Sequence, residues 1–215
     1  MKILVNKKQQ DINRHQLQSR INGFMSVSLD IGTGSGKTVY NNAAKKPANF
    51  YIGLDSCAQG MFENSVRMTK IEKKSKIANA LFVVSSIEHP PEELFGTADT
   101  ITVILPWGSL RDGIIKADPQ IVSNLRLLGK KKTQLFVLTG YDQNNEPSEL
   151  IKRDLPVLSM DYFKTIAPHY YKHKIRLDDV KTIDNNGLKQ IDSDWAKRLA
   201  YGTERTMYAL SFDYE

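Results

Sequence analysis

The chain has 215 residues, 40% of them hydrophobic and 25% charged, and these values predict one globular domain, 1–215, with a substantial core. Thirty Lys and Arg against 24 Asp and Glu give a net charge of +6, which favours an anionic partner. Cys57 is the only cysteine, which excludes an internal disulfide and a cysteine-rich zinc site. The N-terminus does not read as a signal peptide and no apolar run has the length of a transmembrane helix, so we expect a cytoplasmic protein with no membrane partner.

Periodicity predicts a short hairpin and a helix within residues 1–24, followed by alternating strands and helices. The hairpin consists of Lys2–Val5 and Gln9–Asp11, and the helix spans Arg14–Ile21. The expected strands are Val27–Ile31, Phe50–Asp55, Ala80–Ser85, Thr100–Leu105, Gln134–Thr139, Ile175–Ile183 and Met207–Phe212. The expected helices are Gly36–Lys45, Ala58–Lys74, Gly108–Ile115, Asp118–Leu128 and Lys189–Leu199.

Strands separated by helices indicate right-handed βαβ units. The prediction is therefore an α/β fold with a seven-stranded, mostly parallel sheet and helices on both faces. Two longer segments, 141–174 and 184–206, interrupt the last strands, and we expect them to form insertions at the substrate face.

A glycine-rich loop, Asp30-Ile31-Gly32-Thr33-Gly34-Ser35-Gly36-Lys37, follows the first strand of the expected parallel sheet. Glycines allow tight turns and close approach to a ligand, and the following helix offers free N–H groups. A phosphate-binding P-loop requires glycine where Ile31 stands, and a dinucleotide fingerprint requires glycine where Lys37 stands. The Asp-x-Gly-x-Gly-x-Gly pattern of class I S-adenosylmethionine-dependent methyltransferases matches at every defined position.

Asp55 ends the next strand about 20 residues after the glycines, where a carboxylate can accept hydrogen bonds from both ribose hydroxyls of a nucleoside cofactor. Glu88 follows the third strand and is placed to meet the adenine edge, although a solvated loop acid explains it equally. Asp30 has its own simpler alternative as a helix-capping carboxylate.

The only two tryptophans, Trp107 and Trp195, lie far apart in sequence but in similar polar settings. Trp107 follows the fourth strand, at the sheet edge where open α/β proteins bind ligands, although a core position is an alternative for it alone. Trp195 has Asp194, Lys197 and Arg198 beside it, which argues against burial. Two such rings predict a clamp for one extruded nucleobase.

Four segments together resemble the NpmA/Kam family of aminoglycoside-resistance methyltransferases. They are Asp30–Gly34, Tyr51–Asp55, Leu105-Pro106-Trp107-Gly108-Ser109-Leu110 and Trp195-Ala196-Lys197-Arg198-Leu199-Ala200-Tyr201-Gly202. The resemblance covers almost the whole chain. It implies a class I, Rossmann-like fold and methylation of N1 of adenine-1408 in 16S rRNA of the assembled 30S subunit, which gives aminoglycoside resistance.

The family's functional positions can be carried over to matching residues. The resemblance implies S-adenosylmethionine as cofactor, S-adenosylhomocysteine as product, no metal, and a monomer that binds helix 44 of the decoding region. It places Trp107 and Trp195 on the base clamp and Asp30, Gly32, Gly34, Asp55, Glu88, Ile104, Ser109 and Ser193 on the cofactor. It places Arg67, Lys70, Lys73, Lys74, Glu146, Arg153, Arg198 and Arg205 on the rRNA.

Some positions depart from the family pattern. Ile104 and Ser109 replace leucine and threonine, and Val66, Ile71, Thr203 and Glu204 replace basic residues. Lys73, Lys74 and Lys76 supply charge in the same region. Of three basic stretches, 67–76, 130–132 and 197–205, we expect the middle one to be only solvated, while the first and third form one docking face if the fold brings them together.

Adenine N1 carries an in-plane lone pair, so its methylation requires positioning rather than a general base. The absence of a suitably placed catalytic His or Cys fits this chemistry. Two other functions remain open from the sequence. One is a class I methyltransferase acting on tRNA guanine, and the other is a non-catalytic rRNA-binding or ribosome-assembly module.

Overall fold

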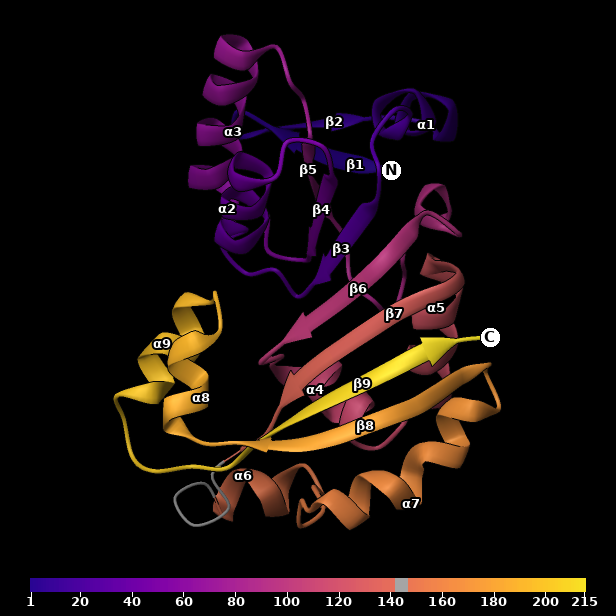
Figure 1. Ribbon diagram of the computed structural model, residues 1–215, viewed down its shortest axis with the longest axis vertical. Coiled ribbons are helices and arrows are strands. Elements are labelled where there is room, and N and C mark those ends of the chain that lie inside the picture. The colour runs from indigo at the N-terminus through magenta and orange to yellow at the C-terminus, as the bar shows by residue number, and fades with distance from the viewer. Residues whose placement is uncertain (142–146) are drawn as a thin grey trace.

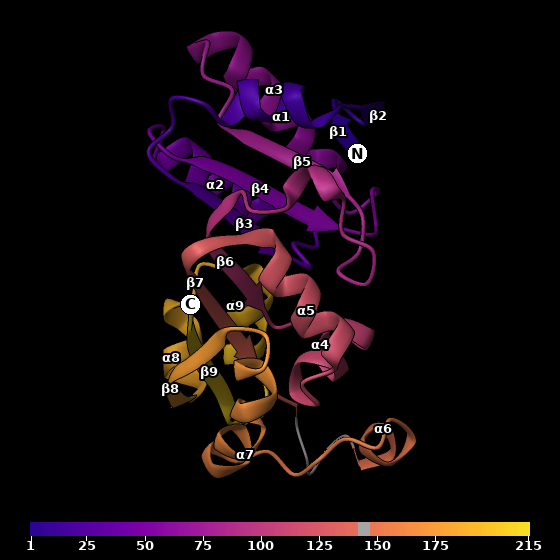
Figure 2. The same ribbon diagram turned by 90° about the vertical axis from the view of Figure 1, so that its right-hand side faces the viewer.

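A nine-stranded sheet forms the centre of the computed structural model, which describes residues 1–141 and 147–215 (Figure 1). Helices cover both faces of this sheet (Figure 2). The strands are β1 (Lys2–Val5), β2 (Lys8–Asp11), β3 (Val27–Ile31), β4 (Phe50–Asp55), β5 (Ala80–Val84), β6 (Ala98–Ile104), β7 (Gly129–Thr139), β8 (Ile175–Ile183) and β9 (Met207–Tyr214). The helices are α1 (Arg14–Ile21), α2 (Lys37–Lys45), α3 (Phe62–Ser75), α4 (Gly108–Ile115), α5 (Pro119–Leu128), α6 (Pro147–Lys152), α7 (Met160–Tyr171), α8 (Asn185–Gln190) and α9 (Asp194–Ala200), with a short 3-10 helix at Glu92–Leu94.

The strand order is β2-β1-β5-β4-β3-β6-β7-β9-β8. Its five central strands, β5 to β7, are parallel, while β9 runs antiparallel between β7 and β8. This confirms the predicted α/β methyltransferase fold. The chain builds from β3 through β4 to β5 on one side and then crosses to β6 on the other. The carboxyl ends of β3 and β6 therefore form a topological switch point, where such sheets bind ligands.

The sheet has two more strands than the seven predicted. The N-terminal hairpin was expected, but not its pairing with the sheet: Ile3 and Leu4 of β1 pair antiparallel with Val83 and Phe82 of β5. Ile3 is fully buried and Leu4 nearly so. The hairpin thereby covers an edge of the parallel sheet that would otherwise present unpaired backbone groups.

Alternating residues of the strands supply separate apolar layers on the two faces. Tyr51 and Phe82 pack with α2 and α3 on one face, whereas Ile52 and Val83 belong to the main core on the other. The main core also contains apolar residues of α1, α4, α5 and α7. On the face of α2, the strand ends at Leu105 and Leu138 pack with α8 and α9. The described residues of the two segments, 147–174 and 184–206, therefore pack onto the sheet.

The helix predicted for Lys189–Leu199 is instead two short helices, α8 and α9. The chain breaks at Ile191, which is extended, and Ser193 caps α9 by accepting a hydrogen bond from the backbone N–H of Ala196. The prediction of a single helix rested on the spacing of apolar residues. That spacing continues across Ser193, so it did not reveal that Ser193 caps a new helix. Among the described helices, none has the length and apolar character to span a membrane.

Candidate active site

The loop after β3 requires glycine at several positions. Gly32, Gly34 and Gly36 have φ values of +71°, +58° and +68°, which disfavour residues with side chains. A Cβ on Gly36 would also overlap the Phe82 ring, and one on Gly32 would lie 2.9 Å from Leu110. The backbone N–H groups of Gly32 and Thr33 donate to the Leu54 carbonyl at 2.8 and 3.1 Å, so the loop turns across the end of β4.

Asp30, the penultimate residue of β3, joins this loop to the neighbouring strand β6. Its carboxylate accepts hydrogen bonds from the hydroxyls of Thr33 and Thr102, each at 2.7 Å. Burial raises the pKa of Asp30 above its ordinary value, with a smaller contribution from Asp55, while the two threonine hydrogen bonds oppose the rise. The alternative of a helix cap is wrong, because Gly36 is the N-cap residue of α2 and the Asp30 carboxylate bonds to the Thr33 and Thr102 hydroxyls instead.

Asp55 ends β4 and is held rigidly by two backbone groups. One carboxylate oxygen accepts from the N–H of Gly34 at 2.8 Å and the other from the N–H of Cys57 at 2.8 Å. Each carboxylate oxygen has a second lone pair. Asp55 can therefore accept two further hydrogen bonds in a fixed orientation, as the vicinal hydroxyls of a ribose would supply.

Glu88, in the loop after β5, and Ser109, in the first turn of α4, face each other. The Ser109 hydroxyl donates to the Glu88 carboxylate at 2.6 Å. Burial works to raise the pKa of Glu88, but this hydrogen bond and others hold it below its ordinary value. Glu88 therefore remains an ionised acceptor at neutral pH, ready for an amino group of a ligand.

Two adjoining cavities open at the switch point. The larger, of about 670 Å³, has Gly32, Gly34, Ile104, Trp107, Ser193, Trp195 and Arg198 in its wall, together with Lys37 and Asp194. The smaller, of about 370 Å³, is lined by Asp55, Ser86, Glu88, Ser109 and Leu110, and it shares Gly32, Gly34, Leu105 and Trp107 with the first. These volumes suit a cofactor-sized ligand that spans both. Every residue predicted to contact the cofactor lines one of them except Asp30, which acts from behind the loop.

The two tryptophans lie together at the mouth of the larger cavity. Trp107 is 62% exposed, so its alternative as a core residue is wrong, and Trp195 is 37% exposed. Their ring centroids are 5.9 Å apart and their planes are inclined by 65°. A base stacked between two parallel rings requires a separation of about 7 Å, twice the van der Waals contact distance. The rings must therefore separate and rotate to admit a base.

The backbone around Trp107 adopts an unusual conformation that presents its ring. Leu105 has φ +51° and Gly108 has φ +61°, and the intervening Pro106 restricts the turn further. Left-handed conformations of residues such as leucine occur mainly where surrounding structure enforces them, often at functional sites. The chain here turns sharply from β6 into α4 and leaves Trp107 at the cavity.

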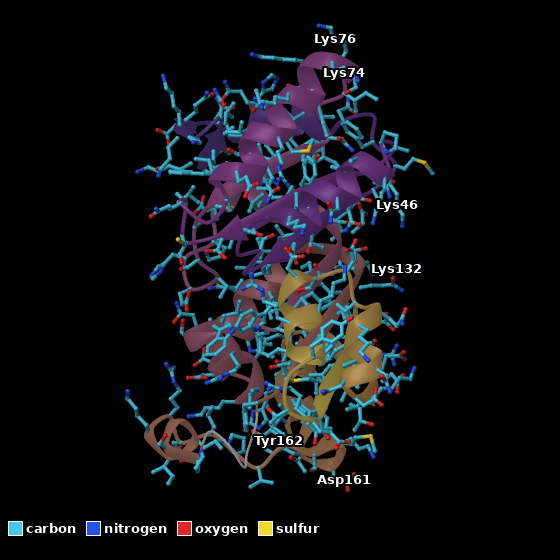
Figure 3. The ribbon with its side chains drawn as sticks, turned by 90° about the vertical axis from the view of Figure 1, so that its left-hand side faces the viewer. Lys46, Lys74, Lys76, Lys132, Asp161 and Tyr162 are labelled. Atoms are coloured by element: carbon cyan, nitrogen blue, oxygen red, sulfur yellow. The ribbon has the colours of Figure 1, made fainter. Side chains whose placement is uncertain are left out.

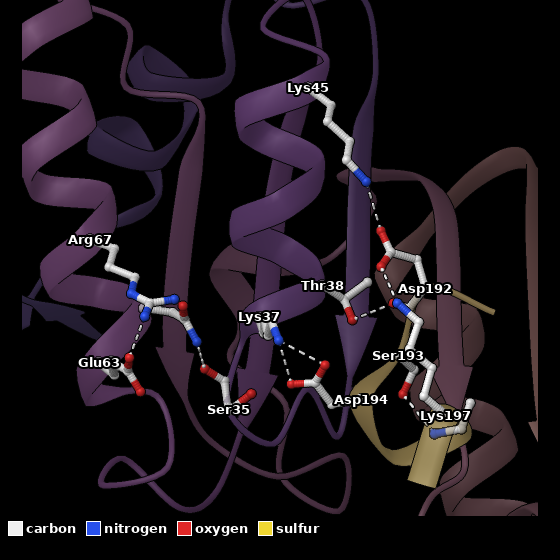
Figure 4. Close-up of polar contacts among 12 residues, drawn as sticks. Ser35, Lys37, Thr38, Lys45, Glu63, Arg67, Asp192, Ser193, Asp194 and Lys197 are labelled. Atoms are coloured by element: carbon white, nitrogen blue, oxygen red, sulfur yellow. Dashed lines mark hydrogen bonds and ion pairs between the residues drawn. The ribbon is translucent and has the colours of Figure 1, made fainter. Parts of the chain in front are cut away.

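A set of charged contacts joins the α8–α9 insertion to α2 beside the cavity (Figure 4). Lys37 donates to both carboxylate oxygens of Asp194 at 2.8 Å. Asp192 accepts from Lys45 at 3.1 Å, and its backbone carbonyl accepts from the hydroxyl of Thr38 at 3.1 Å. We call these contacts between α2 and residues 192–194 the strap. The strap places Trp195 over the glycine loop.

The residues predicted to bind rRNA lie in three places. Arg67, Lys70, Lys73 and Lys74 occupy exposed positions of α3. Arg198 lies in α9, and Arg205 lies in the segment between α9 and β9. Figure 3 shows α3, with Lys74 and Lys76 at its tip, on the same side of the molecule as α8 and α9. The first and third basic stretches therefore share a face. The middle stretch, 130–132, is exposed, as expected of a solvated segment, but Lys130 also forms an ion pair with Asp99 at 2.8 Å.

Arg153 follows α6, and its guanidinium contacts Asp112 of α4 at 2.9 Å. The helix before it, α6, lies at the opposite end of the molecule from α3 (Figure 1). Glu146, also predicted to face rRNA, lies outside the described residues.

Sequence reasoning missed Arg111, Lys37, Asp192 and Asp194. Arg111 is only 5% exposed although it is charged. The sequence did contain a signal for its burial. Arg111 precedes the buried Ile114 and Ile115 by three and four residues, so all three share one face of α4. The strap residues had no comparable signal, because their pairing joins positions about 150 residues apart.

Comparison with known proteins decides the family. The family model of 16S rRNA (adenine(1408)-N(1))-methyltransferase, NpmA, matches residues 2–213. The chain belongs to the NpmA family. A family member from Escherichia coli, a 16S rRNA (adenine(1408)-N(1))-methyltransferase, is 37% identical to it, with 98% of this chain and 97% of the relative aligned.

Solved structures of NpmA-like enzymes agree with the fold. A tryptophan-to-alanine variant of the 16S rRNA (adenine(1408)-N(1))-methyltransferase from Catenulisporales acidiphilia, crystallised with the cosubstrate SAM, gives a TM-score of 0.88 at 29% identity and covers 100% of this chain and 96% of that one. The aminoglycoside resistance methyltransferase NpmB1 gives a TM-score of 0.84 at 29% identity, and the alignment covers 100% of this chain and 99% of that one. This chain's cofactor is accordingly S-adenosylmethionine, and its glycine loop, fixed Asp55 and paired cavities fit that molecule.

Proposed function

We propose that this NpmA-family enzyme methylates N1 of adenine-1408 in 16S rRNA of the assembled 30S subunit, with the target base flipped between Trp107 and Trp195. The observation that carries the proposal is the contact of these two exposed tryptophans at the mouth of the cavity beside the glycine loop. No core-packing role accounts for a ring as exposed as Trp107. The family match supplies the target, and the cavity supplies the place of reaction.

The two cavities divide the cofactor between them. The smaller cavity suits the adenosine part, with Asp55 accepting from the ribose hydroxyls and Glu88 from the adenine amino group. The larger suits the methionine part, lined by Gly32, Gly34, Ile104 and Ser193, with Ser109 orienting Glu88 at their junction. Asp30 contributes by holding Thr33 and thus the loop. The bound cofactor supplies a methyl group activated by a sulfonium.

The protein's contribution to the reaction is positioning. Trp107 and Trp195 hold the base so that its N1 lone pair faces the methyl group, and stacking is worth about 1–3 kcal/mol per base, comparable to the cost of extrusion. N1 has no proton to lose, so the site requires no base. Methylation leaves the adenine positively charged, and the electron-rich faces of the tryptophans favour that charge as it develops.

Docking rests on charge and on the shape of folded rRNA. Phosphate contacts from α3, Arg153, Arg198 and Arg205 position the enzyme without reading sequence. Such a footprint favours the decoding region of helix 44 in a whole subunit over a short oligonucleotide. We propose that a single chain, acting in the cytoplasm as one domain with its two insertions at the rRNA, is sufficient. A methyl group and a charge on the base edge then obstruct aminoglycosides and give resistance.

The reaction is tested by incubating purified protein with S-adenosylmethionine and unmethylated 30S subunits, followed by primer extension across the decoding site. We expect reverse transcription to stop at adenine-1408, because a methyl group on N1 blocks base pairing. Methyl transfer to tRNA instead would support the tRNA guanine alternative. Cofactor binding without transfer to either RNA would support a non-catalytic module, and both outcomes would refute the proposal.

A further inference from the structure

Arg111 is a buried cation directly behind the base clamp. It lies on the first turn of α4, and its side chain is among the few charged ones in the described core. Burying a guanidinium costs several kcal/mol unless its charge and donors are compensated. Such a residue at an otherwise apolar helix position therefore indicates a specific task for its contacts.

The guanidinium is held by one carboxylate and two aromatic rings. Its Nε donates to Asp112 at 3.2 Å. Its central carbon lies 5.8 Å from the centroid of the Trp107 ring and 5.6 Å from that of the Tyr141 ring. Tyr141 is itself buried and donates its hydroxyl to the Pro156 carbonyl. The cation thus contacts both the buried ring of Tyr141 and the exposed ring of Trp107.

A second arginine shares the same carboxylate. Asp112 accepts from Arg111 with one oxygen and from Arg153 with the other, at 3.2 and 2.9 Å. Arg153, which follows α6, is thereby connected through Asp112 to Arg111 behind Trp107. Two arginines on one carboxylate restrict the rotamers of all three side chains, and this gives Arg111 a defined orientation.

We propose that Arg111 is a positioning residue that sets the plane of the Trp107 ring before the base arrives. This inference rests on the proposed function, because the ring's orientation matters only if Trp107 stacks on the base. Trp107 is 62% exposed, and its ring contacts Trp195 only edge to face. The Arg111 guanidinium therefore supplies a buried, fixed support for the ring, and both residues line a cavity of about 140 Å³ together with Tyr141 and Arg205.

The two-tryptophan composition allows a direct test. In a Trp195→Phe background Trp107 is the only tryptophan, and acrylamide quenching and fluorescence anisotropy report on its ring alone. We expect Arg111→Leu to raise the quenching constant of Trp107 about twofold and to lower its anisotropy. In a Trp107→Phe background the same substitution should leave Trp195 nearly unchanged.

The kinetic consequence is measured with both tryptophans present. A misaligned ring costs orientation in the reaction rather than docking, so kcat for 30S methylation should fall at least tenfold while KM for 30S and Kd for S-adenosylhomocysteine stay within twofold. Arg111→Lys keeps the charge but not the planar guanidinium. Its Trp107 quenching constant and its kcat should lie between those of the wild-type protein and of Arg111→Leu.

Arg126→Leu is the matched control. Arg126 also packs over an aromatic ring, that of Tyr214 at 5.3 Å, but from α5 and away from both cavities. It should alter neither tryptophan's quenching nor kcat.

Unchanged quenching of Trp107 in Arg111→Leu would overturn the inference, whatever happens to kcat, and so would unchanged kcat despite increased quenching. If Arg111→Leu does not fold, as judged by circular dichroism, the same criteria apply to Arg111→Lys. Failure of the base clamp itself is separate: it would appear as full methylation by Trp107→Ala, while the quenching experiment still reports whether Arg111 holds the ring.

Discussion

Lys37 and Asp194 form a two-pronged ion pair, with the lysine 2.8 Å from both carboxylate oxygens, across 157 positions of the chain. It links the helix after the glycine loop to the helix that carries Trp195. Both side chains line the larger cavity and are about half exposed. The strap thus closes one side of the site with contacts that water and salt can compete for.

Breaking this ion pair should affect ligand exchange more than stability. Exposed pairs contribute about 0–1 kcal/mol, so Asp194→Asn and Lys37→Met should each shift the melting temperature by only a few degrees. We expect both to raise the dissociation rate of S-adenosylhomocysteine about two- to fivefold in stopped-flow measurements, because the insertion opens more often. Asp178→Asn, which breaks an ion pair with Arg176 on β8, is the control. Equal rates in all variants would show that the strap does not limit exchange.

Gly36 should tolerate no side chain. Its φ of +68° and the Phe82 ring both oppose a Cβ. Gly96→Ala is a matched control, since φ is +65° and nothing lies within 4 Å of the added Cβ. We expect the control to lower the free energy of unfolding by about 1–2 kcal/mol, from the left-handed conformation alone. Gly36→Ala should lose roughly 1–3 kcal/mol more through overpacking. Equal losses in urea denaturation would exclude the predicted clash.

The Ser109–Glu88 hydrogen bond predicts a specific pH dependence. A carboxyl whose pKa is lower in the folded state contributes stability above its unfolded pKa, about 4.5, and that contribution is lost as pH falls through the lower folded value. Ser109→Ala should therefore melt below the wild-type protein near neutral pH, and the gap should narrow as pH drops below about 4.5. Ser109→Thr keeps the hydroxyl, so its melting temperature should stay close to that of the wild-type protein. A gap that widened in acid would contradict the assignment.

Lysines at the end of α3 should bind phosphate. Lys74 is exposed at the tip of the helix (Figure 3). A plot of log affinity against log salt has a negative slope, and each lost phosphate contact reduces its magnitude by about 0.7–0.9. Lys74→Ala should therefore weaken 30S binding at low salt and flatten this dependence by about one contact. Lys130→Ala is the control, because the Lys130 side chain forms an ion pair with Asp99. If the salt dependence of 30S affinity is the same for Lys74→Ala, Lys130→Ala and the wild-type protein, Lys74 does not contact phosphate.

Much of the central sheet could be predicted because its strands are buried apolar runs. Val27–Ile31 and Phe50–Asp55 have the predicted bounds, since flanking glycine and polar residues end each strand. The cofactor loop was equally readable, because positive φ angles demand glycine at fixed spacing. Both depend on local chemistry.

The remaining features depend on contacts between distant segments. The break before α9 coincides with Asp192, whose partner Lys45 lies on another element. The pairing of β1 with β5 depends on which edge of the sheet is uncovered. The sequence predicted that the two tryptophans lie together, but their edge-to-face contact and the position of Arg111 depend on packing between α4 and Tyr141.

The central claim is that the target base is held between Trp107 and Trp195, and single-turnover methylation of 30S subunits measured alongside 30S affinity tests it most directly. Because docking depends on the basic face, Trp107→Ala and Trp195→Ala should each reduce the methylation rate at least a hundredfold with 30S affinity within about threefold of the wild-type protein. Near-normal methylation by either variant, or an equal loss of methylation and binding, would contradict the base clamp.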